Sequence, residues 1–229
     1  MRRLLVLTAV ACAALAAAGV AGATRECKGF QVCVPVAGPW VLAPSRAETH
    51  WQLSCPKNFV VGGLDAELTT RALDLAFRAT LGSPVNPGIS TSTAAVFLGR
   101  LVVGRDPAAS FRPHIGCIPS QGGGARVPTA HHKVHPPGHP TVLRATPFAV
   151  RVGAARHVTR TCRIGERLVT STYAIGFYTR QAPARAVARA VHVSGKNGRG
   201  RVSLTIRGGA RLRGVHAVVQ LDLLCAGGA

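Results

Sequence analysis

Acidic side chains are scarce in this sequence. Only 8 of its 229 residues are Asp or Glu, against 28 Lys and Arg, so the formal net charge is +20 at pH 7. Arg outnumbers Lys by 24 to 4. Genome base composition explains that preference for Arg but leaves the shortage of acids unexplained. A field of this sign attracts polyanions such as nucleic acid, anionic lipid head groups and acidic polysaccharides.

The local motifs of common enzyme classes are missing as well. The chain has no Gly-x-Ser-x-Gly, no His-Glu-x-x-His and no phosphate-binding glycine loop in front of a helix. Residues 195–200 have the composition of such a loop, but they lie between two strand patterns and predict a hairpin tip. We therefore expect no enzyme activity and no cofactor.

Aromatic residues make up only 5% of the chain. Beyond Phe148, the second half offers mainly Tyr173, Phe177 and Tyr178, and the first two of these are expected to face inward. Sequence-tolerant binding of single strands uses exposed aromatic side chains. Nucleic acid is therefore an unlikely partner except non-specifically, through its phosphates and with strong salt dependence.

One long apolar run occurs, and it stands at the N-terminus. Arg2 and Arg3 precede an apolar stretch over 4–20, and small residues follow at 21–23. This pattern is typical of a signal peptide over residues 1–23, cleaved after Ala23. An uncleaved anchor and lipidation at Cys12 are less favoured alternatives. We expect a secreted protein or one of the extracytoplasmic cell envelope.

Six cysteines remain after that cleavage, and in an exported chain they predict disulfides. Six cysteines allow fifteen pairings. The spacing selects among them, because Cys55 and Cys117 are 62 residues apart while Cys162 and Cys225 are 63 apart. We therefore predict the pairs Cys55–Cys117, Cys162–Cys225 and Cys27–Cys33. No Cys-x-x-Cys pattern points to a zinc cluster.

The two cysteine frames predict an internal duplication. When Cys55 is aligned with Cys162, His50 falls on His157, and each copy has a glycine-rich turn near its middle. We expect one domain over 24–118 and another over 141–229, joined by a Gly/Pro/His-rich linker over 119–140. About 100 residues each is a comfortable domain size.

Alternation with a period of two predicts strands throughout. It is clear over 73–81 and over 219–225, and strands are also expected at 94–98, 101–103 and 110–117. Gly62 and Gly63, inside an apolar strand, indicate a bulge or a close approach of another backbone. Residues 183–193 fit a helix or a strand, and we predict a strand. The fold class is all-β, as two tandem β-sandwiches.

Two disulfide-bridged β-sandwiches in tandem are similar to the immunoglobulin-like modules of extracellular proteins. The resemblance is one of architecture, and it implies no functional residue. This chain also departs from the pattern. Its tryptophans, Trp40 and Trp51, both precede the first cysteine of the frame, whereas those modules carry a tryptophan on the strand after it.

The charge is divided unequally between the two predicted domains. Residues 24–118 carry 9 basic and 6 acidic side chains, whereas residues 119–229 carry 17 and 2. We expect an anion-binding site where basic residues gather around one turn-rich stretch. Its members are Arg199, Arg201, Arg207, Arg211 and Arg213.

Two other groups of residues are weaker candidates. His131, His132, His135 and His139 stand within nine residues and can ligate a transition metal, although a solvated linker is the favoured interpretation. Asp65 and Glu67 share a strand face and could serve acid–base chemistry or calcium, but a solvent-facing pair is favoured.

Taken together, these patterns favour a non-catalytic binding or structural protein of the cell exterior. Its basic second domain is expected to adhere to an anionic surface polymer or to lipid head groups. Two alternatives stay open. One is a secreted hydrolase that uses carboxylates such as Asp65, Glu67 and Asp106, and the other is an architectural module that associates through sheet edges.

Overall fold

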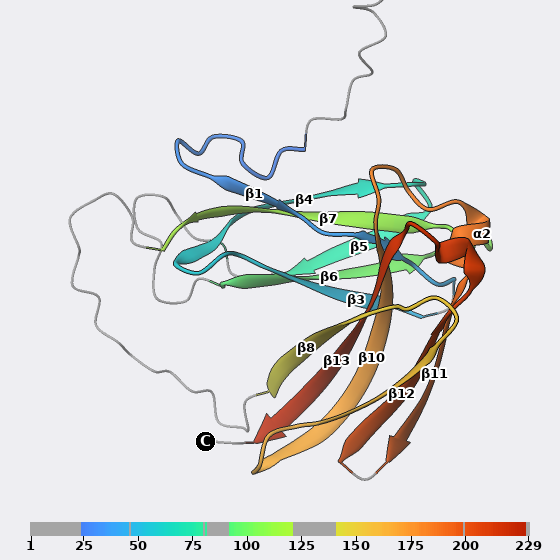
Figure 1. Cartoon of the computed structure of the whole chain (residues 1–229). Coiled ribbons are helices and arrows are strands. Elements are labelled where there is room, and N and C mark those ends of the chain that lie inside the picture. The colour runs from blue at the N-terminus through green and yellow to red at the C-terminus, as the bar shows by residue number, and fades with distance from the viewer. Residues whose placement is uncertain are drawn as a thin grey trace, which may run out of the picture.

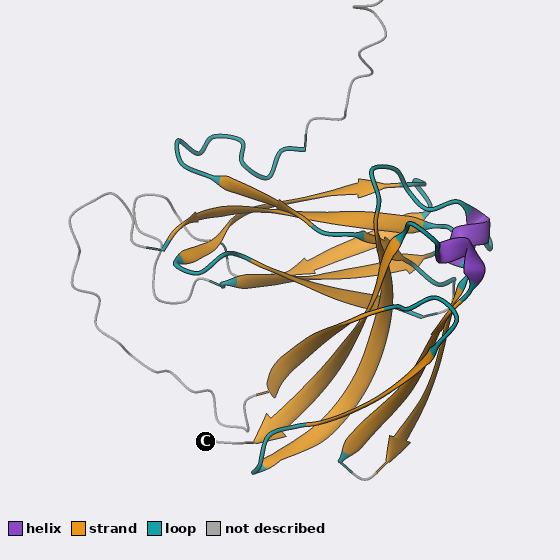
Figure 2. Cartoon of the chain, in the orientation of Figure 1, coloured by secondary structure: helices purple, strands orange, loops and turns teal. Residues whose placement is uncertain are grey.

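The computed structural model describes residues 24–45, 47–79, 81, 92–120, 141–198 and 200–227. The predicted signal peptide and residues 121–140 of the predicted linker, with its four histidines, lie outside these ranges. The regular secondary structure of these residues is nearly all strand, with two short helices at one end (Figure 2). In chain order the elements are β1 (Val34–Ala37), β2 (Trp40–Leu42), β3 (Thr49–Ser54), β4 (Phe59–Leu68), β5 (Leu73–Arg78), β6 (Ala94–Leu101), β7 (Ser110–Pro119), β8 (Thr141–Ala149), β9 (Ala155–Thr161), β10 (Glu166–Tyr178), α2 (Arg185–Ala188), β11 (Val191–Gly198), β12 (Arg201–Gly208), the 3-10 turn η1 (Ala210–Leu212) and β13 (His216–Gly227). The predicted all-β class is confirmed.

The strands form one seven-stranded sheet and two three-stranded sheets. In the large sheet, β4 lies along one edge of β7, and β1 and β2 follow each other along the other edge. Strand β2 then pairs with β10, which pairs with β13, which pairs with β8. The small sheets have the orders β3-β6-β5 and β11-β12-β9. The large sheet therefore runs without a break from the first half of the chain into the second.

Both halves pair their strands in the same order. In the first half, β7 lies between β4 and the β1–β2 edge, while β6 lies between β3 and β5. In the second half, β13 lies between β10 and β8, while β12 lies between β9 and β11. Each half thus contributes three positions to the large sheet and a separate three-stranded sheet.

Both faces of the large sheet contribute side chains to a core. Consecutive residues of a strand point to opposite faces, and on β2 Val41 belongs to the core under β3-β6-β5 while Leu42 packs on the core under β11-β12-β9. Figure 1 shows β3 and β6 on one side of β10 and β13, and β11 and β12 on the other. The sheet β3-β6-β5 therefore covers one face of the large sheet at its first-half end, and β11-β12-β9 covers the other face at its second-half end.

The two cores are built from large apolar side chains with little or no exposure. The first holds Trp51, Phe97, Phe111 and Ile115, together with Ala174 and Val218 from the second half. The second holds Phe148, Phe177, Val202, Leu204, Ile206 and Leu221. Full burial of such a side chain is worth roughly 1.5–3 kcal/mol. The first core is therefore completed by residues of the second half.

All three predicted disulfides are confirmed. Cys55 follows β3 and bonds Cys117 on β7, and Cys162 follows β9 and bonds Cys225 on β13. Each of these links joins a small sheet to the large one. The third link, Cys27–Cys33, closes a short loop in the segment that precedes β1.

The side chain of Gln220 also connects the two halves. It is 5% exposed, and its carboxamide accepts a hydrogen bond from the Gln52 backbone N–H (2.7 Å) and donates one to the Gln52 carbonyl (3.1 Å). Strand β3 is an edge strand, with β6 as its partner. Gln220 thus supplies the hydrogen bonds that a neighbouring strand would give at this point.

The structure corrects two predictions and confirms a third. Residues 101–103 form no strand of their own, because β6 runs on to Leu101. The stretch 183–193 is not one strand: α2 takes its first part, where Ala188 is buried, and β11 begins at Val191. The predicted bulge is present, as a register shift between Val61 and Gly63.

Candidate functional site

The outward side of the sheet β11-β12-β9 carries basic and hydroxyl side chains. On β12, Val202, Leu204 and Ile206 enter the core, so the alternate residues point outward. The strand register places residues of the two flanking strands beside them. We call this set the basic face: Arg201, Ser203, Thr205 and Arg207 of β12, His157, Thr159 and Thr161 of β9, and His192, Ser194 and Lys196 of β11.

Cross-strand contacts order the middle of the basic face. His157 Nδ1 lies 2.9 Å from the Thr205 hydroxyl, and the Thr159 and Ser203 hydroxyls are 3.0 Å apart. Arg201 and Arg207 are six residues apart, which corresponds to about 20 Å along a strand. The basic face is therefore a row of hydroxyl groups with guanidinium groups near its two ends.

Two of the remaining predicted arginines follow β12 in the chain. Arg211 is on η1 and Arg213 follows it, and both are exposed. Arg199 lies outside the described residues. Sequence spacing alone grouped these residues around a turn and missed Lys196, His157 and His192, because only the strand register places those three beside β12.

No acidic side chain belongs to the basic face. The strands β9, β11 and β12 contain no Asp or Glu, and residues 119–229 contain only Glu166 and Asp222. Arg144 Nε donates to Glu166 (2.8 Å), and so does the Arg163 backbone N–H (2.8 Å). The hydrogen bond between Arg144 and Glu166 lowers the pKa of Glu166 and raises the pKa of Arg144. Glu166 is therefore neutralised locally.

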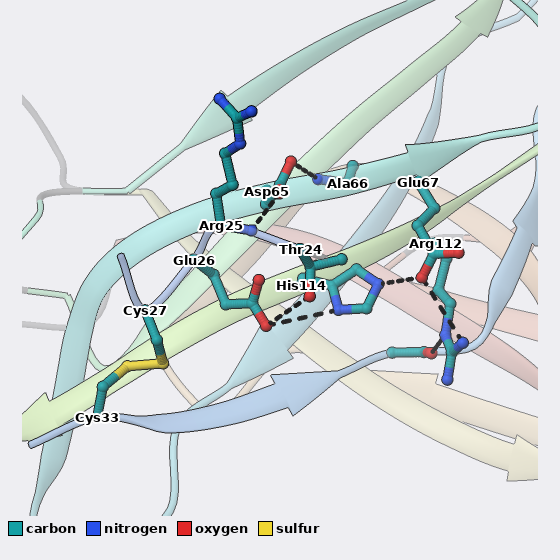
Figure 3. Close-up of polar contacts among 11 residues, drawn as sticks. Thr24, Arg25, Glu26, Cys27, Cys33, Asp65, Ala66, Glu67, Arg112 and His114 are labelled. Carbon is teal, nitrogen blue, oxygen red and sulfur yellow. Dashed lines mark hydrogen bonds and ion pairs between the residues drawn. A yellow bond between two sulfur atoms is a disulfide. The ribbon is translucent and has the colours of Figure 1, made fainter. Parts of the chain in front are cut away.

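A second group of charged side chains surrounds His114 on β7 (Figure 3). His114 is 5% exposed, and its Nε2 lies 2.9 Å from Glu67 while its Nδ1 lies 3.8 Å from Glu26. Glu67 is also 3.7 Å from the Arg112 guanidinium. Thr24 donates a hydrogen bond to Glu26 (3.1 Å). The imidazole is thus enclosed between two carboxylates.

The segment that brings Glu26 to His114 is fixed by its backbone. The Arg25 N–H donates to Asp65 (2.6 Å), and the Cys27–Cys33 link closes the loop beyond it. The Glu26 carbonyl oxygen packs so closely on Gly63 and Gly116 that a Cβ at either position would collide with it. We call residues 24–33 the N-terminal clamp. Its contact with Gly63 is a close backbone approach of the predicted kind.

The three candidate carboxylates have separate partners. Asp65 binds the clamp, Glu67 binds His114, and Asp106 forms an ion pair with Arg185 (3.3 Å). The favoured expectation of a solvent-facing pair is too simple, because Asp65 and Glu67 hold structural contacts. The sequence could not show this, since Arg25 and His114 are distant along the chain.

Two clefts lie between the halves. The larger, about 720 Å³, is lined by apolar residues such as Leu42, Pro44 and Ile175, with Arg105 and Arg189 also in its wall. It follows an edge of β10, and on that edge the described residues pair with β2 only at Gly176 and Phe177. The cleft therefore borders strand backbone that is free to pair.

The smaller cleft, about 220 Å³, contains Asp222 of β13 in its wall. Asp222 is 1% exposed, and neither of its carboxylate oxygens has a hydrogen-bond partner among the residues that the structure describes. Burial raises its pKa from 3.8 to about 7. Such an unpaired buried acid is rare in folded proteins.

Neither the helices of the structure nor comparison with known proteins points to a further function. Among the described residues, no helix is both long and apolar enough to cross a membrane. The three disulfides fit an extracellular or secreted protein. No protein-family model, no curated protein and no solved structure matches this chain.

Proposed function

We propose that this is a non-catalytic protein of the cell exterior that adheres through its basic face to an anionic polymer or lipid surface. The supporting observation is the complete absence of acids from a sheet face that presents Arg201, Arg207 and Lys196. The only two acids of residues 119–229 are withdrawn from solvent contact, one by Arg144 and one by burial. The positive field of this half is therefore not cancelled nearby.

The side-chain chemistry favours an extended ligand with repeated negative charges. Guanidinium groups bind sulfate, phosphate and carboxylate through paired hydrogen bonds, and the hydroxyl row between them can accept and donate along the same ligand. The basic face has no Phe, Tyr or Trp, so it offers no stacking surface for bases. A sulfated or carboxylated polysaccharide, or an anionic head-group layer, fits better than a nucleic acid.

A binding assay with charge-matched variants tests this function. The triple variant Lys196→Ser, Arg201→Ser, Arg207→Ser removes three charges from the basic face, and the control Lys57→Ser, Arg71→Ser, Arg100→Ser removes three exposed charges from the first half. On a sulfated-polysaccharide column the first variant should elute at lower salt, and its affinity should vary less steeply with salt. Equal elution of the two variants would contradict the proposal.

We also propose that the halves are immunoglobulin-like sandwiches related by duplication. Numbering the strands of each half from first to sixth, with β1–β2 counted as one, the small sheet has the order second-fifth-fourth and the large one contains third-sixth. This matches strands B-E-D and C-F of an immunoglobulin domain, with the disulfide between B and F. The first strand takes the place that strand G has there. An experimental structure with a different strand order in the two halves would contradict this.

Association through a sheet edge has one observation in its favour. The edge of β10 beside the larger cleft has free backbone, and such edges pair with other strands. Light scattering on the purified protein tests this, since a monomer at high concentration excludes self-association. The hydrolase alternative has less support, because Asp65, Glu67 and Asp106 each hold another contact.

A further inference from the structure

The smaller cleft is formed jointly by both halves. Asp222 and Leu224 of β13 and Thr172 of β10 make one wall, and His50 of β3, Arg78 of β5 and Val96 of β6 line the other. Gln220, two residues before Asp222, holds the edge of β3 against the large sheet. The cleft therefore lies between the two halves, next to the hydrogen bonds that join Gln220 to Gln52.

The buried Asp222 carboxyl has no hydrogen-bond partner among the described residues. A buried carboxyl is strongly disfavoured in its charged form unless a partner supplies hydrogen bonds or an opposite charge. Counting back from the cysteine of each half, Asp222 of β13 corresponds to His114 of β7. His114 has two carboxylate partners. The missing partner of Asp222 is thus a positively charged or strongly donating group.

The opposite wall carries the complementary charge. Arg78 is exposed at the cleft and forms no ion pair or hydrogen bond with a described residue that would occupy its guanidinium. The other titratable group there, His50, is already held by Glu48 (2.7 Å). No further charged side chain lines the cleft. The cleft therefore carries a carboxyl residue in one wall and a guanidinium residue in the other.

We propose that this cleft binds a small zwitterion of amino-acid size, with its ammonium group on Asp222 and its carboxylate on Arg78. The ammonium group supplies the donors that Asp222 lacks, and the guanidinium group can take a carboxylate in two parallel hydrogen bonds. The aliphatic side chains of Val96 and Leu224 suit the carbon chain between the charges. A volume of about 220 Å³ equals roughly seven waters at about 30 Å³ each.

A metal ion fits this site less well. Among the described residues, Asp222 belongs to no group of three or more His, Cys, Asp and Glu side chains that could share an ion. Arg78 would in addition repel a cation that carries no acid group of its own. An amino acid satisfies both walls at once.

Calorimetry on the full mature chain at pH 8 and low salt tests the proposal with three probes that share a four-carbon chain. These are 4-aminobutyrate, butylamine and butyrate, which carry both charges, only the positive charge and only the negative charge. We expect 4-aminobutyrate to bind at least tenfold more tightly than the other two. Asp222→Asn and Arg78→Gln should each weaken it at least tenfold, whereas the controls Asp74→Asn and Arg71→Gln should leave it unchanged.

Three results would overturn the site. These are no saturable binding of 4-aminobutyrate to the unmodified protein, equal affinities for the three probes, and undiminished binding to Asp222→Asn. Thermal unfolding at pH 8 separates loss of the site from loss of the fold, because Asp222→Asn should unfold no earlier than the unmodified protein. Its retention on a sulfated-polysaccharide column should also be unchanged, since the basic face lies on another sheet.

Discussion

The strands β7 and β13 hold corresponding places in the two halves, yet the faces beside their cysteines are covered differently. On β7, Gly116 leaves room for the N-terminal clamp, which brings Glu26 to His114. On β13 the corresponding positions are Leu224 and Asp222, and they face the small cleft. One face is closed by a segment of its own half with matched charges, and the other is closed only partly, by the opposite half. The same strand order thus supports a sealed face and an open one.

The largest expected effect concerns a feature that the halves share. Replacing both cysteines of either long disulfide by Ala should lower the free energy of unfolding by about 4 kcal/mol, because each closes a loop of about 60 residues. Removing Cys27–Cys33 should cost about 2 kcal/mol. Chemical denaturation of the three double variants measures this, and a large difference between the two long links would show that the halves are not energetically alike.

Asp222 should make the free energy of unfolding depend on pH. Its pKa is raised from 3.8 to about 7 on folding, so between these values the unfolded chain releases a proton that the folded chain keeps. The free energy of unfolding should then fall as pH rises from 4 to 7, by on the order of 4 kcal/mol in total, and level off above that. Asp222→Asn should remove this fall.

Denaturation at several pH values measures that difference. Asp74→Asn is the control, because Asp74 is exposed and paired with Arg100. Glu166 has a lowered pKa and contributes the opposite trend, with stability lost as pH decreases, but it is common to all three proteins. A constant difference between Asp222→Asn and the unmodified protein from pH 4 to 8 would refute the effect.

Exchanging the residue before the cysteine tests why one face is sealed. Gly116→Leu introduces the residue that β13 carries at this place, and its side chain should displace the clamp from β7. Overpacking of this kind costs about 1–3 kcal/mol, and limited proteolysis should then cut within residues 24–33. Leu224→Gly is the reciprocal change, and it should enlarge the small cleft without affecting the clamp.

The smallest effect is expected at Gln220 and Arg112, which occupy the same position relative to the cysteines Cys225 and Cys117 of their strands. Gln220→Leu leaves the Gln52 backbone groups buried without partners, which should cost about 1–3 kcal/mol. Arg112→Leu removes a hydrogen bond to the Gly38 carbonyl (3.2 Å) and the ion pair with Glu67 (3.7 Å), both from a partly exposed side chain, so a loss of about 1 kcal/mol is expected. Thermal unfolding of both variants compares them, and an equal loss would show that Gln220 has no special part in joining the halves.

Much of the fold could be predicted because it follows from local patterns. Alternation over 219–225 gave both the strand and its inward residues, and the cysteine spacing gave all three disulfides. The helix α2 was missed because Ala-rich sequence fits strand and helix alike, and the packing of Ala188 decides between them. Local patterns carry no such tertiary information.

The candidate sites were predictable only in part. Sequence charge identified the second half, but which basic residues share a face depends on the register of β11 and β9 against β12. Gln220 and Asp222 point away from the second core, as the alternation over 219–225 predicts, yet they are buried against the first half. Only the arrangement of the two halves shows that.

The strand β2 takes part in both halves, since it pairs with β7 on one edge and with β10 on the other. Ala174 and Val218 likewise belong to the interior of the opposite half. A fragment that ends within the linker would therefore expose an unpaired strand and an incomplete interior, and it should aggregate or stay unfolded. Replacing one half by an unrelated sequence should therefore also destabilise the half that stays.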